Sequence, residues 1–306
     1  MLNTAVLFII FNRPETTQRV FDVIKSVKPK RLYITADGPR KNNENDQINS
    51  KKCRSIIDQI DWECELKTLF REENLGCRNA VSDAITWFFN QEEQGIVLED
   101  DCLPHPSFFQ YCEELLEKYK ETPEIMLISG DNFQNGIKRG DASYYFSRYN
   151  HIWGWASWRR AWEKYDVNME SFPQKKEENF IQHVFKQRKI QKYWMKRFQK
   201  SYDKKIDTWD YQWMYTILSH QGVIILPNIN LISNVGFGEQ STHTAKANKR
   251  LANLPVKEMK LPLTHPSEIK INEMADLYTF NRIFKPPFFE RLLTYINSKW
   301  QKWQKI

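Results

Sequence analysis

The sequence predicts an α/β protein with a mostly parallel, Rossmann-like sheet, flanked by helices and followed by a helical C-terminal region. Short apolar runs alternate with segments of helical periodicity through the first hundred residues, which is the pattern of βαβ units with right-handed crossovers. Acidic or polar turns directly follow several of these runs. Of the 306 residues, 41% are hydrophobic and 27% are charged, a balance typical of a folded globular chain and not of a disordered one.

The elements of the first half follow in a regular order. Pro14, after the first apolar run, is placed to open a helix, because proline is favoured in the first turn. Asp-Gly-Pro and Asn-Leu-Gly turns follow the second and third strands. The predicted strands are residues 5–11, 31–36, 65–70 and 95–98, and the predicted helices include residues 14–27, 56–60 and 80–88.

The second half is less regular. Residues 144–158 are dense in aromatic side chains, beyond what one face of a core element needs. Residues 174–205 are helical in pattern and rich in Lys and Arg, and we interpret this basic segment as a solvated helix face. The other predicted elements are a helix over 107–119, a strand over 125–129, a helix over 158–164 and a strand over 223–227.

Charge and cysteine content limit the class of protein. The net charge of +7 and the pI near 9.0 favour anionic partners. The five cysteines contain no C-x-x-C pair, which argues against a disulfide framework or a zinc site and fits a reducing cytoplasm. Residues 5–11 are too short for a membrane span and lack a basic leader. Neither a G-x-G-x-x-G fingerprint nor a P-loop sequence is present.

Three adjacent carboxylates follow the strand at 95–98. Glu99, Asp100 and Asp101 should emerge at the carboxyl edge of the sheet, as should Asp37 after the second strand. A divalent cation would relieve the repulsion among the three charges, since Mg²⁺ and Mn²⁺ prefer oxygen ligands and can bridge to a phosphate. A solvated acidic loop ahead of a helix N-terminus is the alternative.

Several segments together resemble a GT-A-type glycosyltransferase, and within that class the bacterial relatives of N-acetylglucosaminyltransferase I. The resemblance implies a GT-A domain over residues 1–245, with a nucleotide-sugar half to about residue 130 and an acceptor half after it, and a helical extension over 246–306. The segments that carry it are Phe11-Asn12-Arg13-Pro14, Asp37, Asn74-Leu75-Gly76, Val97-Leu98-Glu99-Asp100-Asp101, Gly154-Trp155 and Trp209-Asp210-Tyr211-Gln212-Trp213-Met214.

The resemblance also implies roles for single residues. Asp101 would be the direct ligand of Mn²⁺ or Mg²⁺. Asp210 matches the general base, although this chain has Asp-Tyr-Gln-Trp where the family has two adjacent acids, so Asp207, on the acceptor side, stays a rival. The residues expected at the nucleotide are Asn12, Arg13, Asp37, Arg78, Glu99 and Asp100.

Two further residues are candidates from their own sequence context. His243 lies in a polar loop with spaced glycines and is a candidate second contact to the metal or the diphosphate. Trp155 is a candidate for stacking on an acceptor sugar, because Gly154 beside it permits close approach; packing in the core is the alternative.

These features lead to the hypothesis of a metal-dependent, inverting glycosyltransferase that uses a UDP-sugar, with UDP-N-acetylglucosamine as a candidate. Its acceptor would be a glycan or a lipid-linked saccharide in surface polysaccharide or glycoconjugate assembly. A sugar-1-phosphate nucleotidyltransferase is an alternative, although the residues after the first strand lack the glycine-rich, basic phosphate loop of that class. A non-catalytic glycan or nucleic-acid binding protein is another, but the basic residues form no recognised nucleic-acid module.

The C-terminal residues 288–303 combine an aromatic and aliphatic stripe with flanking lysines. That pattern fits an interfacial helix on an anionic membrane, and equally a helix that docks on the body or on a second subunit. We therefore expect a cytoplasmic protein, with peripheral contact at the inner face of the cytoplasmic membrane as an open alternative.

Overall fold

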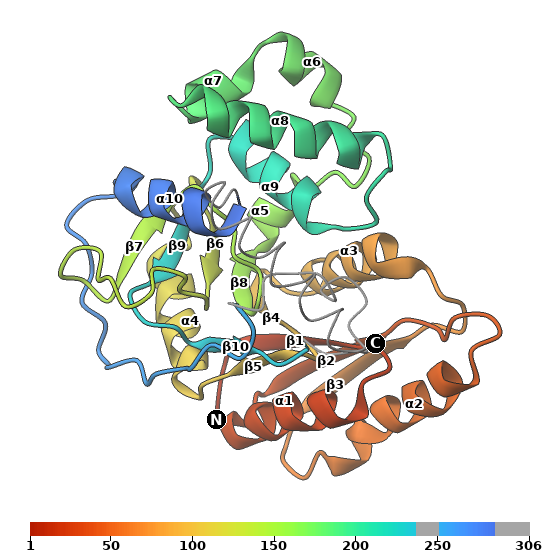
Figure 1. The fold of residues 1–306 in the computed structure, drawn as a ribbon. Helices are drawn as coiled ribbons and strands as arrows, with labels where there is room; N and C mark the ends of the chain where they lie inside the picture. The colour runs from red at the N-terminus through yellow and green to blue at the C-terminus, as the bar shows by residue number, and fades with distance from the viewer. Residues whose placement is uncertain (237–250, 285–306) are drawn as a thin grey trace, which may run out of the picture.

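The computed structural model describes residues 1–236 and 251–284, and its centre is an eight-stranded sheet between layers of helices (Figure 1). The predicted alternation of strand and helix in the first half is confirmed. The elements are β1 (Ala5–Ile10), α1 (Pro14–Val27), β2 (Arg31–Ala36), α2 (Glu44–Arg54), β3 (Glu65–Phe70), α3 (Gly76–Phe89) and β4 (Gln94–Glu99).

The helix predicted around residues 56–60 is placed differently. Those residues form most of a short 3₁₀ turn, η1 (Ser55–Gln59), at the end of α2. The helix itself begins earlier, because the side chain of Asn43 accepts the N–H of Asp46 and caps the first turn. Its first two turns contain one apolar residue, the exposed Ile48. The apolar periodicity at residues 56–60 therefore lies only at the end of the helix.

The strand order is β3-β2-β1-β4-β8-β6-β9-β7. Strands β3, β2, β1 and β4 are mutually parallel, whereas β8 runs antiparallel to both β4 and β6, and β7 runs antiparallel to β9. The sheet is therefore mostly parallel, as predicted, with β8 inserted in reverse. The elements between residues 102 and 234, apart from the helices α6–α8 described below, are β5 (Cys102–Pro104), α4 (Ser107–Lys118), β6 (Ile125–Ser129), β7 (Tyr144–Ser147), β8 (Trp155–Trp158), α5 (Arg159–Trp162), α9 (Asp210–Ser219), β9 (Val223–Pro227) and β10 (Ile232–Asn234).

Both faces of the sheet are buried. Neighbouring residues of β1 serve opposite faces, since Phe8 packs in the cluster with α1 and α4 while Leu7 packs in the cluster with α3 and α9. The aromatic segment 144–158 supplies β7 and β8, whose residues are all buried. Its aromatic density is thus explained by two strands covered on both faces.

The basic segment forms a separate helical lobe of α6 (Phe172–Glu177), α7 (Phe180–Val184) and α8 (Arg188–Tyr202), seen at the top of Figure 1. Its apolar side chains, including Trp194 and Phe198 of α8, pack with Met214 and Tyr215 of α9. The lobe therefore sits directly on the helix that begins with Asp210.

The described residues after 250 return to the sheet. Met259 and Leu263 are buried in the core with α1 and α4, and Ile271 pairs with Phe146 of β7. They end in α10 (Glu273–Thr279) and a π-helical turn, Phe280–Phe284. The domain boundary at residue 245 stays a prediction, and the predicted helix at 288–303 lies outside the described residues. Within the part of the chain that the structure describes, no helix has the length and apolar content to cross a membrane.

Helix α10 carries a buried acid, Asp276, which accepts hydrogen bonds from the Ser147 hydroxyl at 2.6 Å and the Arg148 N–H at 3.1 Å. Burial raises its pKa from 3.8 to about 7. The folded state thus keeps a proton that the unfolded state has lost, so this group lowers the free energy of unfolding as the pH rises from about 4 to about 7. Asn can accept the Arg148 N–H with Oδ1 and donate from Nδ2 to the Ser147 hydroxyl oxygen. We expect the Tm of Asp276→Asn, relative to the unsubstituted chain, to increase between about pH 5 and pH 8. A pH-independent difference would contradict the raised pKa.

Candidate active site

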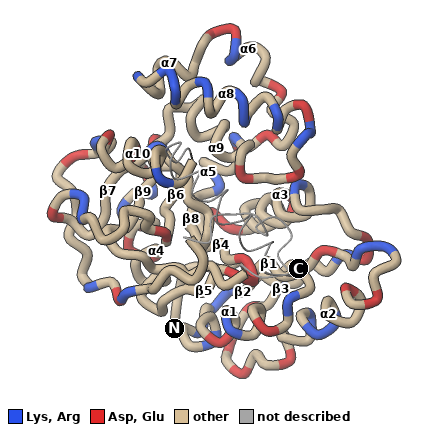
Figure 2. The backbone as a smooth tube through the Cα atoms, in the orientation of Figure 1, with Lys and Arg blue, Asp and Glu red and all other residues tan. Residues whose placement is uncertain are grey.

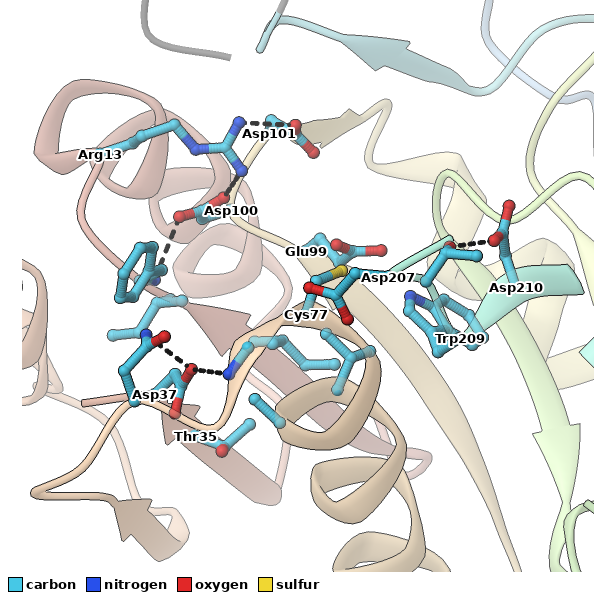
Figure 3. Close-up of a pocket in the computed structure, with 18 of the residues that line it drawn as sticks. Arg13, Thr35, Asp37, Cys77, Glu99, Asp100, Asp101, Asp207, Trp209 and Asp210 are labelled. Atoms are coloured by element: carbon cyan, nitrogen blue, oxygen red, sulfur yellow. Dashed lines mark hydrogen bonds and ion pairs between the residues drawn. The ribbon is translucent and has the colours of Figure 1, made fainter. Parts of the chain in front are cut away.

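A cavity of about 400 Å³ lies at the carboxyl ends of β1, β2 and β4, where ligands bind in open α/β sheets. Its opposite wall is the start of α9 and the residues just before it (Figure 3). Among the described residues, its walls carry six carboxylates, from Asp37, Glu99, Asp100, Asp101, Asp207 and Asp210, and three guanidinium groups, from Arg13, Arg40 and Arg71.

Arg13 is the countercharge of the acidic triplet. Its Nη1 donates to Asp101 Oδ2 at 2.7 Å, and its Nη2 donates to Asp100 Oδ1. The other oxygen of Asp100 accepts the Phe11 N–H at 3.2 Å. Burial raises the pKa of Glu99 and of Asp100, although Arg13 opposes the rise at Asp100. Burial alone would lower the pKa of Arg13, but the two carboxylates raise it above its ordinary value, so the guanidinium stays charged.

The donor set at Asp101 suits a hard cation that arrives with a phosphate. The described residues contain no group of three or more His, Cys, Asp or Glu arranged to hold a metal. Mg²⁺, however, is commonly bound through one or two carboxylates together with substrate phosphates. Asp101 Oδ1 accepts a weak hydrogen bond from the Cys102 thiol at 3.3 Å, and the side chain is 17% exposed. Asp101 can therefore contribute a carboxylate oxygen to such a cation.

Asp37, at the end of β2, holds the turn that begins α3. Its carboxylate accepts the N–H groups of Gly38, Leu75 and Gly76 and the side-chain amide of Asn74, at 2.9 to 3.2 Å. An ionised carboxylate has about four lone-pair sites, so these donors use its accepting capacity. The structure places Asp37 at the cavity as a positioning residue, and its contact with a nucleotide stays a prediction.

Gly38 permits the close approach of this turn to β2. A Cβ at Gly38 would lie 2.5 Å from the carbonyl oxygen of Glu73, a backbone atom that has little freedom to move aside. We expect Gly38→Ala to lower the free energy of unfolding by about 1–3 kcal/mol, the range for overpacking in a well-packed site, as measured by urea denaturation. A change within experimental error would show that the 71–75 backbone adapts.

The opposite wall carries the second pair of acids. Asp207 Oδ1 accepts the N–H of Arg78, in the first turn of α3, at 3.2 Å. Asp210 is the first residue of α9, and its Oδ1 accepts the Thr208 hydroxyl and the Tyr211 N–H. Between them the buried Trp209 lines the cavity. Asp207 thus joins the two walls, and Asp210 lines the cavity from the start of α9 (Figure 3).

Three predicted site residues of the described part of the chain are not among those that line the cavity. Asn12 donates to Asp46 at 2.7 Å, and the Arg78 guanidinium donates to the Val167 carbonyl. Trp155 is 1% exposed and stacks on Trp209 with ring centroids 5.9 Å apart, so it supports the cavity wall from the core. His243 lies outside the described residues.

The polar lining residues that sequence reasoning missed as site candidates include Arg40, Arg71 and Asn74. Arg40 is anchored by the buried Asp46, whose Oδ1 accepts Arg40 Nη2 at 2.8 Å, and its guanidinium lies 5.8 Å from the Phe11 ring. All three follow predicted strands, so their position at strand ends was the available signal. Arginine and asparagine are also common on protein surfaces, so this position did not distinguish them from ordinary surface residues.

No family model and no curated protein matches the chain. Among solved structures, the chain is similar to 4-diphosphocytidyl-2C-methyl-D-erythritolsynthase from Anaerococcus prevotii (TM-score 0.33, 12% identity, 53% of this chain and 75% of that one). It is also similar to HddC from Yersinia pseudotuberculosis (TM-score 0.30, 11% identity, 53% and 80%). A third is UDP-glucose pyrophosphorylase complexed with UDP-glucose (TM-score 0.28, 12% identity, 53% and 71%). At these TM-scores the similarities carry no argument about activity, and the fold class rests on the sheet described above.

Proposed function

We propose that the chain is a metal-dependent, inverting glycosyltransferase that uses a UDP-sugar. The observation that supports this most is the pair of acidic groups on opposite walls of one cavity: Asp101 with Arg13 on the β4 side and Asp210 on the α9 side. Glycosyl transfer with inversion needs charge neutralisation at the departing diphosphate and a base at the acceptor hydroxyl, on opposite sides of the anomeric carbon. The positions of Asp101 and Asp210 on facing walls of the cavity support this proposal.

Asp210 would take the proton of the acceptor hydroxyl. The donors from Thr208 and Tyr211 fix the orientation of its carboxylate, and the buried ring of Trp209 excludes water beside it. We assign the base to Asp210, the residue that matches the general base in the sequence resemblance, and keep Asp207 as the rival; Asp207 Oδ1 accepts the Arg78 N–H and so has a structural role between the two walls.

Asp101 would hold Mn²⁺ or Mg²⁺ together with phosphate oxygens of the donor. When bound, the cation supplies Lewis-acid stabilisation of the leaving diphosphate. Arg13 and Arg71 add fixed positive charge on the same side of the cavity, and Phe11 with Arg40 offers a flat surface near the end of β2. UDP-N-acetylglucosamine is the first donor to test, and a glycan or lipid-linked saccharide is the acceptor class.

A sugar-1-phosphate nucleotidyltransferase is the second candidate. The three arginines that line the cavity suit a triphosphate. However, only residues 11–13 separate β1 from α1, and they include no glycine that would let backbone N–H groups wrap a phosphate. Reaction between two ionised phosphates would also give Asp210 no proton to take.

Thermal-shift measurements against UDP-, GDP- and CMP-sugars, with and without Mn²⁺, test the proposal. We expect UDP-sugars with Mn²⁺ to raise the Tm, since a ligand at a hundred times its Kd stabilises the fold by about 2.7 kcal/mol. A product assay then separates the two candidates: glycosyl transfer releases UDP from the UDP-sugar, whereas nucleotidyl transfer releases pyrophosphate from UTP and a sugar phosphate. Pyrophosphate release, or stabilisation by no UDP-sugar, would contradict the proposal.

A further inference from the structure

The positive charge of the chain is concentrated in the helical lobe α6–α8. Residues 172–205 contain eleven Lys or Arg and three Asp or Glu, an excess larger than the net charge of +7 of the whole chain. The rest of the chain is therefore close to neutral. Figure 2 shows Lys and Arg along α6, α7 and α8. The molecule thus has one strongly basic end.

Four of these cations form an inclined stripe on the exposed side of α8. Residues four apart lie on the same helix face, so the stripe runs for about 18 Å along the helix. All four side chains are exposed, while Trp194 and Phe198 of the same helix are buried in the lobe. No ion pair within residues 1–236 and 251–284 involves any of them. The stripe consists of Arg188, Lys192, Lys196 and Lys200.

The stripe weakens the helix that carries it. Like charges four residues apart repel one another, and the stripe contains three such neighbouring pairs. Arg188 also lies at the N-terminal end of α8, where the helix dipole disfavours a cation, and the first turn holds no acid to offset it. The charges therefore do not serve the stability of α8, and an anionic partner would remove their repulsion.

We propose that this face of α8 docks on an anionic lipid surface. A plane of phosphate headgroups can meet four cations on one side of a helix at the same time, and lysine suits such a surface because its charge needs no fixed partner geometry. A single-stranded nucleic acid would gain from several exposed aromatic platforms beside the cations. Trp194 and Phe198 of α8 are buried and Tyr193 packs against Phe280, which leaves Tyr202, 38% exposed, at the end of the helix. Charge complementarity thus favours the lipid surface.

Helix α8 packs on α9 at the acceptor wall of the cavity through its buried side, and the stripe lies on its exposed side. The Arg197 guanidinium of α8 lies 5.7 Å from the ring of Tyr211, the residue after Asp210. Docking through α8 would hold this wall near the membrane, where a lipid-linked acceptor is presented. That consequence for the acceptor rests on the proposed function, whereas the docking itself rests on the charge of the lobe.

The experiment is co-sedimentation of the full chain with vesicles of phosphatidylcholine alone and of phosphatidylcholine mixed with phosphatidylglycerol. We expect binding to the mixed vesicles only. The triple variant Lys192→Gln, Lys196→Gln, Lys200→Gln should bind about 100-fold more weakly, because each cation near an anionic surface contributes about a fivefold factor. The control variant Lys30→Gln, Lys51→Gln, Lys52→Gln removes the same charge from exposed positions around α1 and α2, and should bind like the unsubstituted chain.

Equal binding by the two triple variants would overturn the proposal, as would tighter binding to duplex DNA than to the mixed vesicles. Both variants keep residues 285–306, so a contribution from that segment cancels in the comparison. Stabilisation by a UDP-sugar with Mn²⁺ is measured on the same proteins. If the UDP-sugar does not stabilise the protein but the stripe variant loses vesicle binding, the proposed function fails and the docking surface stands. If the UDP-sugar stabilises the protein but both triple variants bind vesicles equally, the proposed function stands and the docking surface fails.

Discussion

Asp210→Asn is expected to lower kcat for sugar transfer by about 10³-fold, within the range of 10²–10⁴ that a positioned general base contributes. Asn has nearly the size of Asp and can still accept hydrogen bonds from Thr208 and Tyr211, but it cannot take a proton from the acceptor. The measurement is the initial rate of UDP release with acceptor and Mn²⁺. The Tm shift produced by the UDP-sugar should stay unchanged, because Asp210 contacts the acceptor side.

Asp207→Asn is the matched control for this assignment. Asp207 lies in the same cavity, three residues away, but its Oδ1 accepts the Arg78 N–H and so ties α9 to α3. We expect Asp207→Asn to leave more of kcat than Asp210→Asn does. If Asp207→Asn causes the larger loss of kcat while both variants keep their Tm and bind the UDP-sugar, the base is Asp207.

Arg13→Gln is expected to lower the free energy of unfolding by about 3 kcal/mol, because breaking a buried ion pair leaves an uncompensated charge. The side chains of Arg13 and Asp100 are 19% and 3% exposed, and the guanidinium bridges Asp100 and Asp101. Without it, three adjacent carboxylates repel one another at the end of β4. Denaturant unfolding measures the loss.

Two further variants test the cause. Adding Asp100→Asn to Arg13→Gln should recover most of the stability, since the buried carboxylate without a partner is then gone. Lys25→Gln removes a cation from the ion pair with Asp61, whose side chain is 63% exposed, and should change the stability by less than about 1 kcal/mol. Equal losses from Arg13→Gln and Lys25→Gln would contradict the buried pairing.

The first half of the fold could be predicted because its signals are local. Pro14 opens α1, and the apolar runs of β1, β2 and β4 are bounded by turn residues. The position of β8 in the sheet could not be predicted, because its antiparallel pairing with β4 and β6 depends on residues far apart in the chain. Aromatic content does not indicate strand direction, so the sequence of residues 144–158 did not predict two separate strands.

For the candidate site, too, local sequence signals predicted one part, and the other part depends on long-range contacts. The triplet Glu99-Asp100-Asp101 was placed at the sheet edge by a rule about strand ends, and it lines the cavity. The contacts that decide the roles of its neighbours are long-range: Arg13 reaches Asp100 across 87 positions, and Asp207 reaches the Arg78 N–H across 129. Sequence spacing contains no sign of either contact.

The reversal of β8 also affects when the cavity can form during folding. Because β8 is antiparallel to β4, the residues that enter it, including Trp153, arrive at the same edge as the residues that leave β1, β2 and β4. The walls therefore come from segments near residues 11, 37, 100, 153 and 209, which meet only when the sheet is complete. Folds with such non-local contacts pay the entropy of loop closure before they gain contacts, and they fold slowly. A growing chain that ends near residue 130 would hold the acidic triplet without an opposing wall, so ligand binding should begin only after α9 has folded.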